Sequence, residues 1–160
     1  QAAEVVAATR YAPLGSRGMY GSGPHTGFHV RPPAEHLATA NARVHVTAML
    51  ESKHAFDHLD EIAAVPGIDA LTIGPTDLSQ DLGVLGTPAQ RDVLREHRVR
   101  LGEAARKHGK TVAMAVDTIE AVREVIALGA TIINYSSDTN VLRSTYAAAV
   151  AEIRTPKERS

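Results

Sequence analysis

The feature that most constrains the fold is an apolar run followed by an amphipathic stretch, a pattern that occurs four times along the chain. The four runs cover residues 44–50, 70–73, 111–116 and 131–135. They are nearly all apolar rather than alternating, which is typical of parallel strands buried on both faces. Because a helical pattern follows each run, the sequence predicts four strand–helix units joined by right-handed connections, an α/β fold.

The amphipathic stretches have helical spacing and recognisable ends. The helix after the first run is expected to begin at Ser52, whose side chain can cap it, and the longest helix covers about 89–108. Asp117 is expected to start the next helix, and Asp138 to cap the last one. Residues 154–160 are predicted to form a tail.

The first part of the chain does not share this pattern. Residues 1–9 are expected to end a helix, and residues 10–33 are rich in Gly and Pro and predict a long loop. We therefore expect one domain over 1–153, made of the helix end and loop in 1–43 and the four units in 44–153.

Four units do not close a (β/α)8 barrel, which needs about 250 residues. An open sheet of four parallel strands leaves two unpaired edges. Two explanations stay open at this point: the chain pairs with something, or the front half of the barrel is missing. The sequence starts with Gln1 rather than Met, which is expected of a fragment.

Composition excludes several classes of function. The chain has 17 Lys and Arg against 18 Asp and Glu, so it lacks the basic excess that holds nucleic acid. Cysteine is absent, which excludes disulfides and thiolate metal sites. No apolar run approaches the roughly 20 residues that cross a bilayer, and no secretory signal is visible. We expect a cytoplasmic protein without a membrane partner.

Glu51 and Asp77 are the sharpest candidates for a site, because they follow the first two strands and ligands of α/β folds bind at the carboxyl ends of strands. Two carboxylates without thiols suit Mg²⁺ or Mn²⁺, with water or substrate completing the coordination shell. The alternative is structural: Glu51 is an exposed acid and Asp77 is a helix N-cap.

Other candidate residues surround this pair or lie elsewhere. The amides of Thr76 and Asp77 follow Gly74-Pro75 and can receive a carboxylate or phosphate if a short helix starts there. His54 and His58 have the i, i+4 spacing of zinc ligands, but no third ligand is obvious, and solvated histidines are the simpler interpretation. His25 and His29 lie in the glycine-rich loop, from which they could reach a site.

Three segments together resemble a known family. Residues 10–18 are similar to the family segment R-Y-x-P-x-G-x-R-G, and residues 49–52 to a strand that ends in I-E-[ST]. Residues 65–79 are similar to V-x-G-V-D-x-[IL]-x-[IV]-G-P-x-D-L-S. The family is that of the HpcH/HpaI aldolases, metal-dependent class II aldolases of the phosphoenolpyruvate- and pyruvate-binding barrel superfamily. The resemblance covers about residues 1–153.

The resemblance implies that the chain is the second half of a (β/α)8 TIM barrel. It implies a carbon–carbon lyase that cleaves a 4-hydroxy-2-keto acid to pyruvate, or a related 2-keto acid, and an aldehyde. The family's metal ligands correspond to Glu51 and Asp77, and its substrate-carboxylate amides to Thr76 and Asp77. The implied cofactor is Mg²⁺, Mn²⁺ or Co²⁺. The implied assembly is a homo-oligomer, commonly a hexamer, with exchanged C-terminal helices.

The sequence departs from the family in two places. Met49 occupies the position of a substrate-binding Gln and cannot donate that hydrogen bond. The family's catalytic His base, its supporting Asp and its Arg lie on the first half of the barrel, and no part of this chain matches those segments. No catalytic residue is therefore assigned, and the 160 residues alone are expected to be inactive.

Two alternatives to the aldolase remain. Related barrels cleave CoA thioesters of the citryl and malyl type, although the G-P-x-D-L-S segment favours keto-acid aldolases. A half-barrel could also be a non-catalytic binding or assembly module that completes itself by dimerising edge to edge.

Overall fold

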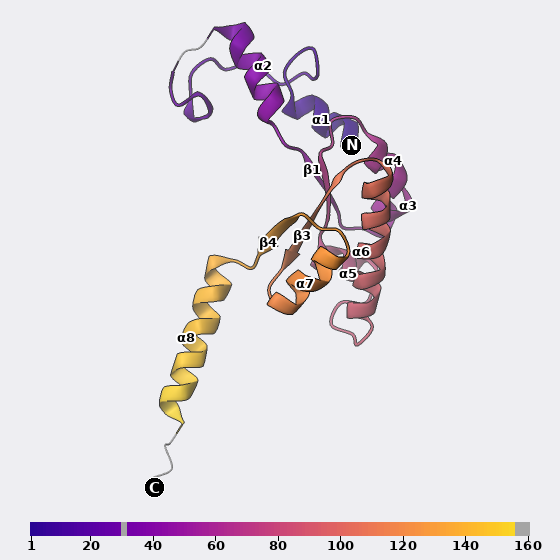
Figure 1. Ribbon diagram of the computed structural model, residues 1–160, viewed down its shortest axis with the longest axis vertical. Coiled ribbons are helices and arrows are strands. Elements are labelled where there is room, and N and C mark those ends of the chain that lie inside the picture. Colours follow the sequence, from indigo (N-terminus) through magenta and orange to yellow (C-terminus); the bar gives the residue numbers. More distant parts are fainter. Residues whose placement is uncertain (30–31, 156–160) are drawn as a thin grey trace.

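The computed structural model describes residues 1–29 and 32–155 and contains a parallel four-stranded sheet in the order β1-β2-β3-β4 (Figure 1). Consecutive strands along the chain are therefore neighbours, as the four strand–helix units predict. Neighbouring strands pair in a defined register: Met49 of β1 pairs with Thr72 of β2, and Ala113 of β3 pairs with Ile132 of β4. The strands are β1 (Thr47–Leu50), β2 (Ala70–Ile73), β3 (Thr111–Val116) and β4 (Ile132–Tyr135).

Helices cover one face of this sheet. Helix α6 packs along β2 and β3, with α4 beside it and α7 against β3. The helices, with one short 3-10 turn, are α1 (Ala2–Thr9), η1 (Pro24–Thr26), α2 (Pro33–Arg43), α3 (Lys53–Asp57), α4 (Leu59–Ala64), α5 (Pro75–Asp81), α6 (Gln90–Lys107), α7 (Ile119–Ala127) and α8 (Asp138–Arg154). The apolar core lies between the helices and the sheet. Its largest fully buried apolar side chains are Leu50, Leu71, Leu78, Leu101 and Val125.

Burial on both faces, which the apolar runs predict, is found in β2 but not in the other strands. All four residues of β2 are buried. In β3, burial alternates: Val112, Met114 and Val116 are buried, whereas Ala115 is exposed. The second face of the sheet is thus largely open in the described chain. It is the face that would point into a closed barrel.

The first 43 residues contain a helix that the sequence does not predict. Helix α2 begins at Pro33. Proline is tolerated at the first helical position, because the N–H that it lacks would have no partner within the helix. An ion pair ties this region to the sheet: Arg10 Nη2 lies 3.1 Å from Asp69 Oδ2, which also accepts a 2.7 Å hydrogen bond from the Val46 amide. The amino ends of β1 and β2 are thereby clamped together.

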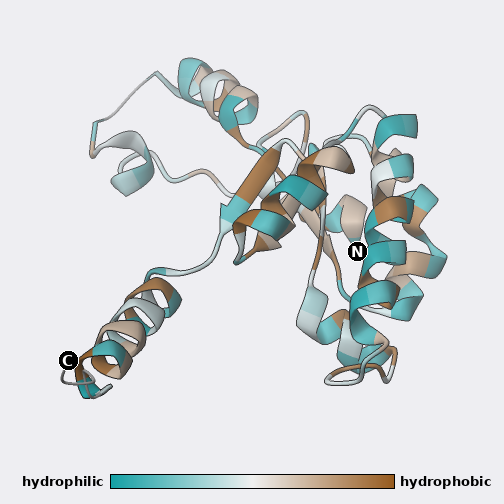
Figure 2. Cartoon of the chain, turned by 60° about the horizontal axis from the view of Figure 1, so that its bottom comes forward, coloured by the Kyte–Doolittle hydropathy of each residue, from teal (hydrophilic) through white to brown (hydrophobic). Residues whose placement is uncertain are grey.

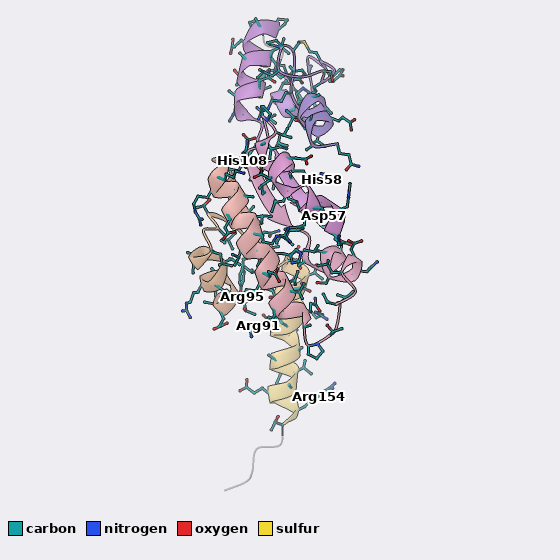
Figure 3. The ribbon with its side chains drawn as sticks, turned by 90° about the vertical axis from the view of Figure 1, so that its right-hand side faces the viewer. Asp57, His58, Arg91, Arg95, His108 and Arg154 are labelled. Carbon is teal, nitrogen blue, oxygen red and sulfur yellow. The ribbon has the colours of Figure 1, made fainter. Side chains whose placement is uncertain are left out.

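The single helix expected after the first strand is in fact two. Helix α3 ends at Asp57 and α4 begins at Leu59, and His58 between them has φ −110° and ψ 20°, outside helical geometry. Ser52 caps α3 as expected, accepting a 3.2 Å hydrogen bond from the Ala55 amide. Figure 3 shows Asp57 and His58 at this break, on the side of the chain that carries α6.

Helix α8 stands away from the rest of the chain (Figures 1 and 2). None of its residues is buried, although it carries exposed apolar side chains at helical spacing, namely Val141, Leu142, Tyr146, Val150 and Ile153. It ends at Arg154, and the rest of the predicted tail after Thr155 lies outside the described residues. Among the described helices, none combines the length and apolar character that a membrane crossing requires.

Candidate metal and substrate site

The ends of β1 and β2 bring the two predicted metal ligands to one edge of the sheet. Leu50 pairs with Ile73, and the Gly74 amide donates a 3.1 Å hydrogen bond to the Leu50 carbonyl. Glu51 follows the first strand directly, and Asp77 lies in the first turn of α5 after the second strand. The two carboxylates therefore come from short, well-anchored segments at the carboxyl ends of neighbouring strands, where α/β folds bind ligands.

Gly74 is required by the position of Glu51. A Cβ atom at residue 74 would lie 2.7 Å from Glu51 Oε2 and 2.8 Å from Glu51 Cβ, and 3.4 Å from Met49 Sδ. Since real Cβ atoms do not approach other atoms so closely, any larger residue would displace the Glu51 side chain. The absence of a side chain at Gly74 lets the carboxylate lie across the start of the segment that carries Asp77.

Helix α5 holds Asp77 through buried contacts. Pro75 is its first residue and has no amide proton, so the first free N–H groups of the helix belong to Thr76 and Asp77. Leu78 and Ser79 are fully buried, and Ser79 Oγ donates a 2.6 Å hydrogen bond to the Pro75 carbonyl. Asp77 is the third residue of the helix and not its N-cap, which is Gly74, so the simple capping role is wrong.

The far end of α5 is tied to the segment after Glu51. Asp81 Oδ2 accepts a 2.6 Å hydrogen bond from the Lys53 amide, at the start of α3. The segments that carry Glu51 and Asp77 are thus linked both at Gly74 and through Asp81. Such support limits how far either carboxylate can move from the other.

Both carboxylates lack a protein counter-charge. Glu51 and Asp77 are exposed, and neither forms an ion pair or a side-chain hydrogen bond with residues 1–29 or 32–155. Two unpaired carboxylates at one rim fit a hard divalent cation, which takes oxygen ligands. Within the same described ranges, no group of three or more His, Asp or Glu residues could hold a metal, so water or substrate would supply the other ligands.

A hollow of about 370 Å³ opens beside these residues on the uncovered face of the sheet. Met49, Thr72, Ala113 and Ile132 line it, together with the segment from Gly74 to Asp77. Met49 is 60% exposed, and its thioether offers the hollow an apolar surface without a hydrogen-bond donor. We call this space, next to the Glu51–Asp77 pair, the strand-end hollow.

A second, more polar hollow of about 500 Å³ adjoins it and shares Pro75, Thr76, Ala115 and Asn134. Its polar lining includes Arg98 from α6, Asn134 at the end of β4 and Ser136, whose φ of 53° is unusual for a residue with a side chain. The sequence places Ser136 at the end of the fourth strand, but it does not single out Arg98 or Asn134 as site residues. Arg98 is separated from Asp77 by most of a helix and a loop, so no local motif marks it.

The other candidate residues lie outside this site. The rings of His54 and His58 meet edge to face with centroids 4.8 Å apart, and His58 Nδ1 lies 3.2 Å from Glu61 Oε1, so this pair forms local contacts. No third possible metal ligand joins them in the described chain. His25 and His29 lie by η1, near the amino ends of the strands, and line a different hollow.

The helices after β3 and β4 start at neighbouring residues, not at the predicted acids. Thr118 caps α7, accepting a 3.1 Å hydrogen bond from the Ala121 amide. Ser137 caps α8 and accepts a 3.2 Å hydrogen bond from the Asn140 amide, so Asp138 is the first residue inside the helix. Hydroxyl side chains are equally good N-caps, and sequence alone did not choose between adjacent candidates.

Comparison with known proteins defines the class. Residues 1–145 match the family model described as HpcH/HpaI aldolase/citrate lyase, and the chain belongs to this family. It is 34% identical over 144 residues to a 5-keto-4-deoxy-D-glucarate aldolase from Klebsiella pneumoniae subsp. pneumoniae. The match covers 90% of this chain and 55% of that protein, so the chain spans about half the length of this relative.

Solved structures agree with the family and the fold. An HpcH/HpaI aldolase from Desulfitobacterium hafniense DCB-2 superposes with a TM-score of 0.88 and 29% identity, covering 99% of this chain and 61% of that one. A family protein from Burkholderia cenocepacia J2315 gives a TM-score of 0.83 and 32% identity, covering 96% and 60%. The four parallel units have the fold predicted for the second half of a (β/α)8 TIM barrel.

Proposed function

We propose that this chain carries the metal-binding half of a class II aldolase that cleaves 4-hydroxy-2-keto acids to pyruvate, or a related 2-keto acid, and an aldehyde. The observation that carries the proposal is the unpaired Glu51 and Asp77 on either side of Gly74, in a chain that belongs to the aldolase family. Mg²⁺, Mn²⁺ or Co²⁺ is the proposed cofactor, with Glu51 and Asp77 as its protein ligands.

A bound divalent cation supplies Lewis-acid stabilisation of the negative charge that develops on the keto acid during carbon–carbon cleavage. The amides of Thr76 and Asp77, the first free donors of α5, would bind the substrate carboxylate. Met49 and Ala113 would pack against the apolar part of the keto acid in the strand-end hollow. The adjoining hollow, with Arg98 and Asn134, has room and polar groups for the aldehyde half.

We assign no general base within the chain. The base and the arginine implied by the family resemblance belong to segments that these 160 residues do not match. We therefore propose that polypeptide outside these residues supplies the base and the arginine. We expect little turnover by the 160 residues alone. A cytoplasmic location also stays a prediction.

The test is pyruvate release from a series of 4-hydroxy-2-keto acids, using protein expressed from the complete gene. We expect a chelator to abolish the activity and Mg²⁺, Mn²⁺ or Co²⁺ to restore it. Glu51→Gln and Asp77→Asn should each lower kcat/KM by roughly 100-fold or more, because each removes a charged ligand from the proposed cation. Full activity in the presence of chelator would refute the proposal.

Matched controls come from exposed acids of α6 that have no ion-pair partner in the described chain. Glu96→Gln and Asp92→Asn remove the same charges as the two site variants and should leave kcat/KM within about twofold of wild type. A similar loss in these controls would point to net charge or stability instead of a metal site.

A CoA-thioester lyase is the second candidate, because the matched family description also covers citrate lyase. A large gain in kcat/KM with citryl- or malyl-type thioesters over free keto acids would reverse the order of the two candidates. If neither substrate class turns over although the cation binds, the non-catalytic binding or assembly module becomes the better description.

We also propose a homo-oligomer, with a hexamer implied by the family resemblance. Helix α8 supports this, since an amphipathic helix without a buried residue is stabilised when its apolar side chains pack against another surface. Sedimentation equilibrium should give a multimer for the wild-type protein. Replacing Leu142 and Tyr146 by Glu should lower its mass, whereas an unchanged mass would remove α8 from the interface.

A further inference from the structure

A second hollow lies at the opposite end of the sheet from Glu51 and Asp77. It has a volume of about 560 Å³ and is bounded by the segment after α1, the turn η1 and helix α2. Helices α1 and α2 are labelled in Figure 1. Val44, just before β1, also lines it, and the Arg10–Asp69 ion pair holds this region beside the starts of β1 and β2. The hollow therefore lies on the side where the strands begin. We call it the cationic hollow, because its lining includes Arg17, His25, His29, His36 and Arg43, together with Tyr11.

The lining carries basic side chains without acids. Two arginines and three histidines contribute to it, and no Asp or Glu is among the lining residues that the structure describes. Neither Arg17 nor Arg43 forms an ion pair within residues 1–29 and 32–155. Guanidinium groups gathered around a concave space attract anions, and their planar donors match carboxylate and phosphate oxygens.

His36 is the most informative member of this lining. His36 is only 7% exposed, and its Nε2 atom is buried without a hydrogen-bond partner in the described chain. A buried polar nitrogen without a partner is costly and uncommon in native proteins. An oxygen atom of a bound anion would satisfy this nitrogen, and the neighbouring arginines would balance the anion's charge.

The rings of the hollow are held in place before any ligand binds. Tyr11 is 2% exposed, and Asn41 fixes its backbone by accepting from the Tyr11 amide at 2.7 Å and donating to the Tyr11 carbonyl at 3.0 Å. The Arg17 guanidinium lies 4.8 Å from the Tyr11 ring centroid, a cation–π contact. The His36 ring lies 5.6 Å from both the Tyr11 and His25 rings.

His25 is oriented by a backbone contact. Its Nε2 lies 3.0 Å from the Tyr20 carbonyl oxygen, which can only accept, so this nitrogen carries a proton. The continuous contact series from Arg17 through Tyr11 and His36 to His25 gives the hollow a preorganised wall. Preorganisation lowers the entropic cost of binding a small ligand.

We propose that the cationic hollow is a binding site for a small oxyanion, a phosphate or a carboxylate, which His36 Nε2, Arg17 and Arg43 hold. The site is separate from the Glu51–Asp77 edge and does not depend on the aldolase proposal. Its position at the amino ends of the strands keeps the anion away from the carboxyl ends, where the chemistry of this fold class takes place.

The test is isothermal titration calorimetry with inorganic phosphate, sulfate and succinate as separate probes, on protein expressed from the complete gene. A chelator in the buffer removes divalent cations, which could bind phosphate at the other edge. We expect saturable binding of one anion per chain. Preference for phosphate and sulfate would define a phosphate-type site and preference for succinate a carboxylate site. No saturable binding of any of the three would overturn the proposal.

Variants locate the anion. Arg43→Gln, at an exposed residue with no other partner in the described chain, should weaken binding by about 10- to 100-fold, the range expected for one charge-assisted hydrogen bond. The matched control is Arg91→Gln, an exposed arginine on α6 in Figure 3, and it should bind like wild type. Equal affinity in Arg43→Gln and wild type would also overturn the proposal.

Two further measurements separate this site from the metal edge and from a folding defect. Phosphate should shift the ring nitrogen signal of His36 in a ¹H–¹⁵N spectrum, with the signal assigned by its loss in His36→Asn. The double variant Glu51→Gln, Asp77→Asn should keep wild-type affinity for phosphate. Loss of binding in that variant would place the anion at the metal edge and refute the site proposed here.

Discussion

The two ends of the parallel sheet differ in charge and in construction. At the carboxyl ends of β1 and β2, Glu51 and Asp77 are exposed acids that form no ion pair within the described chain. At the amino ends, Arg17 and Arg43 line a hollow without a described acid. Parallel strands place all their starts at one edge and all their ends at the other, so one sheet can offer two independent chemical surfaces.

The difference in construction is as instructive as the difference in charge. The acidic edge is made by residues that follow the strands directly, so strand register fixes their positions. The cationic hollow is made by a loop and a helix that precede the sheet, held to it by the Arg10–Asp69 ion pair. We expect small changes of backbone geometry to affect the Glu51–Asp77 edge most. We expect the cationic hollow to depend most on the ion pair that anchors it to the sheet.

Apart from removal of the carboxylates themselves, the largest effect is expected from Gly74→Ala. The new methyl group would collide with Glu51, whose Oε2 and Cβ atoms lie 2.7 and 2.8 Å from its position. Because a misplacement of about 1 Å can cost about 100-fold in rate, we expect kcat/KM for pyruvate release to fall by about that factor. Calorimetric titration with Mn²⁺ should show weaker binding in the same variant.

The control for this variant is Gly21→Ala in the loop before η1. A Cβ atom there would meet nothing within 4 Å, and its φ is not positive. Activity and Mn²⁺ affinity should remain at wild-type values. If Gly74→Ala were as active as Gly21→Ala, close packing against Glu51 would have no role in the site.

An intermediate effect is expected from Asp69→Asn at the opposite end. Asp69 accepts hydrogen bonds from Arg10 Nη2 and from the Val46 amide, and the Arg10 side chain is only 10% exposed. Removing the charge should cost roughly 1–3 kcal/mol in the free energy of unfolding, since it weakens two charge-assisted bonds to partly buried groups. Urea denaturation measures this change.

Asp92→Asn, an exposed acid on α6, should change the unfolding free energy by less than about 0.5 kcal/mol. If the two ends of the sheet are independent, Asp69→Asn should affect stability but not catalysis. At a temperature where the variant is fully folded, its kcat should equal that of wild type. A fall in kcat without a loss of stability would show that the two ends are coupled.

The smallest effect is expected at an exposed acid that already accepts hydrogen bonds from two side chains. Hydrogen bonds from Lys107 Nζ and His108 Nε2, each 2.8 Å long, hold the pKa of Asp60 below its ordinary value of 3.8. The folded state therefore favours the carboxylate. Its contribution to stability is present above pH 3.8 and is lost as the pH falls through the lower folded pKa.

Asp60→Asn should accordingly flatten the loss of stability between pH 5 and pH 3, measured as the urea midpoint, while Mn²⁺ affinity at neutral pH stays unchanged. This result would separate a paired surface acid from the unpaired Glu51 and Asp77. An unchanged pH dependence would mean that the Lys107 and His108 contacts do not favour the folded carboxylate.

Sequence predicted the sheet well because its signals are local. Each apolar run became a strand, and the four strands lie parallel in chain order. The segment Ile73-Gly74-Pro75 predicts a strand–turn–helix junction. It does not predict the close approach of Gly74 to Glu51. The metal-binding role of Glu51 and Asp77 rests on this arrangement and on the resemblance, and it stays a prediction.

The parts that sequence missed depend on contacts between distant residues. Helix α2 was not predicted, because Pro32-Pro33 at the end of a Gly- and Pro-rich stretch is typical of a loop. Proline at the first helical position can nevertheless start a helix. The cationic hollow joins residues from Tyr11 to Arg43, and no single motif includes both the loop residues and His36 and Arg43 of α2. Likewise, nothing in the residues around His58 signals the break between α3 and α4, because the apolar spacing continues through it.

The order β1-β2-β3-β4 also has a consequence for biosynthesis. Each strand pairs with the one made just before it, so a chain that emerges from the ribosome can extend the sheet one unit at a time. Within this sheet, no strand has to wait for a partner other than its neighbour along the chain. Helix α8 follows β4 in the chain, so it is made after all four strands of this sheet.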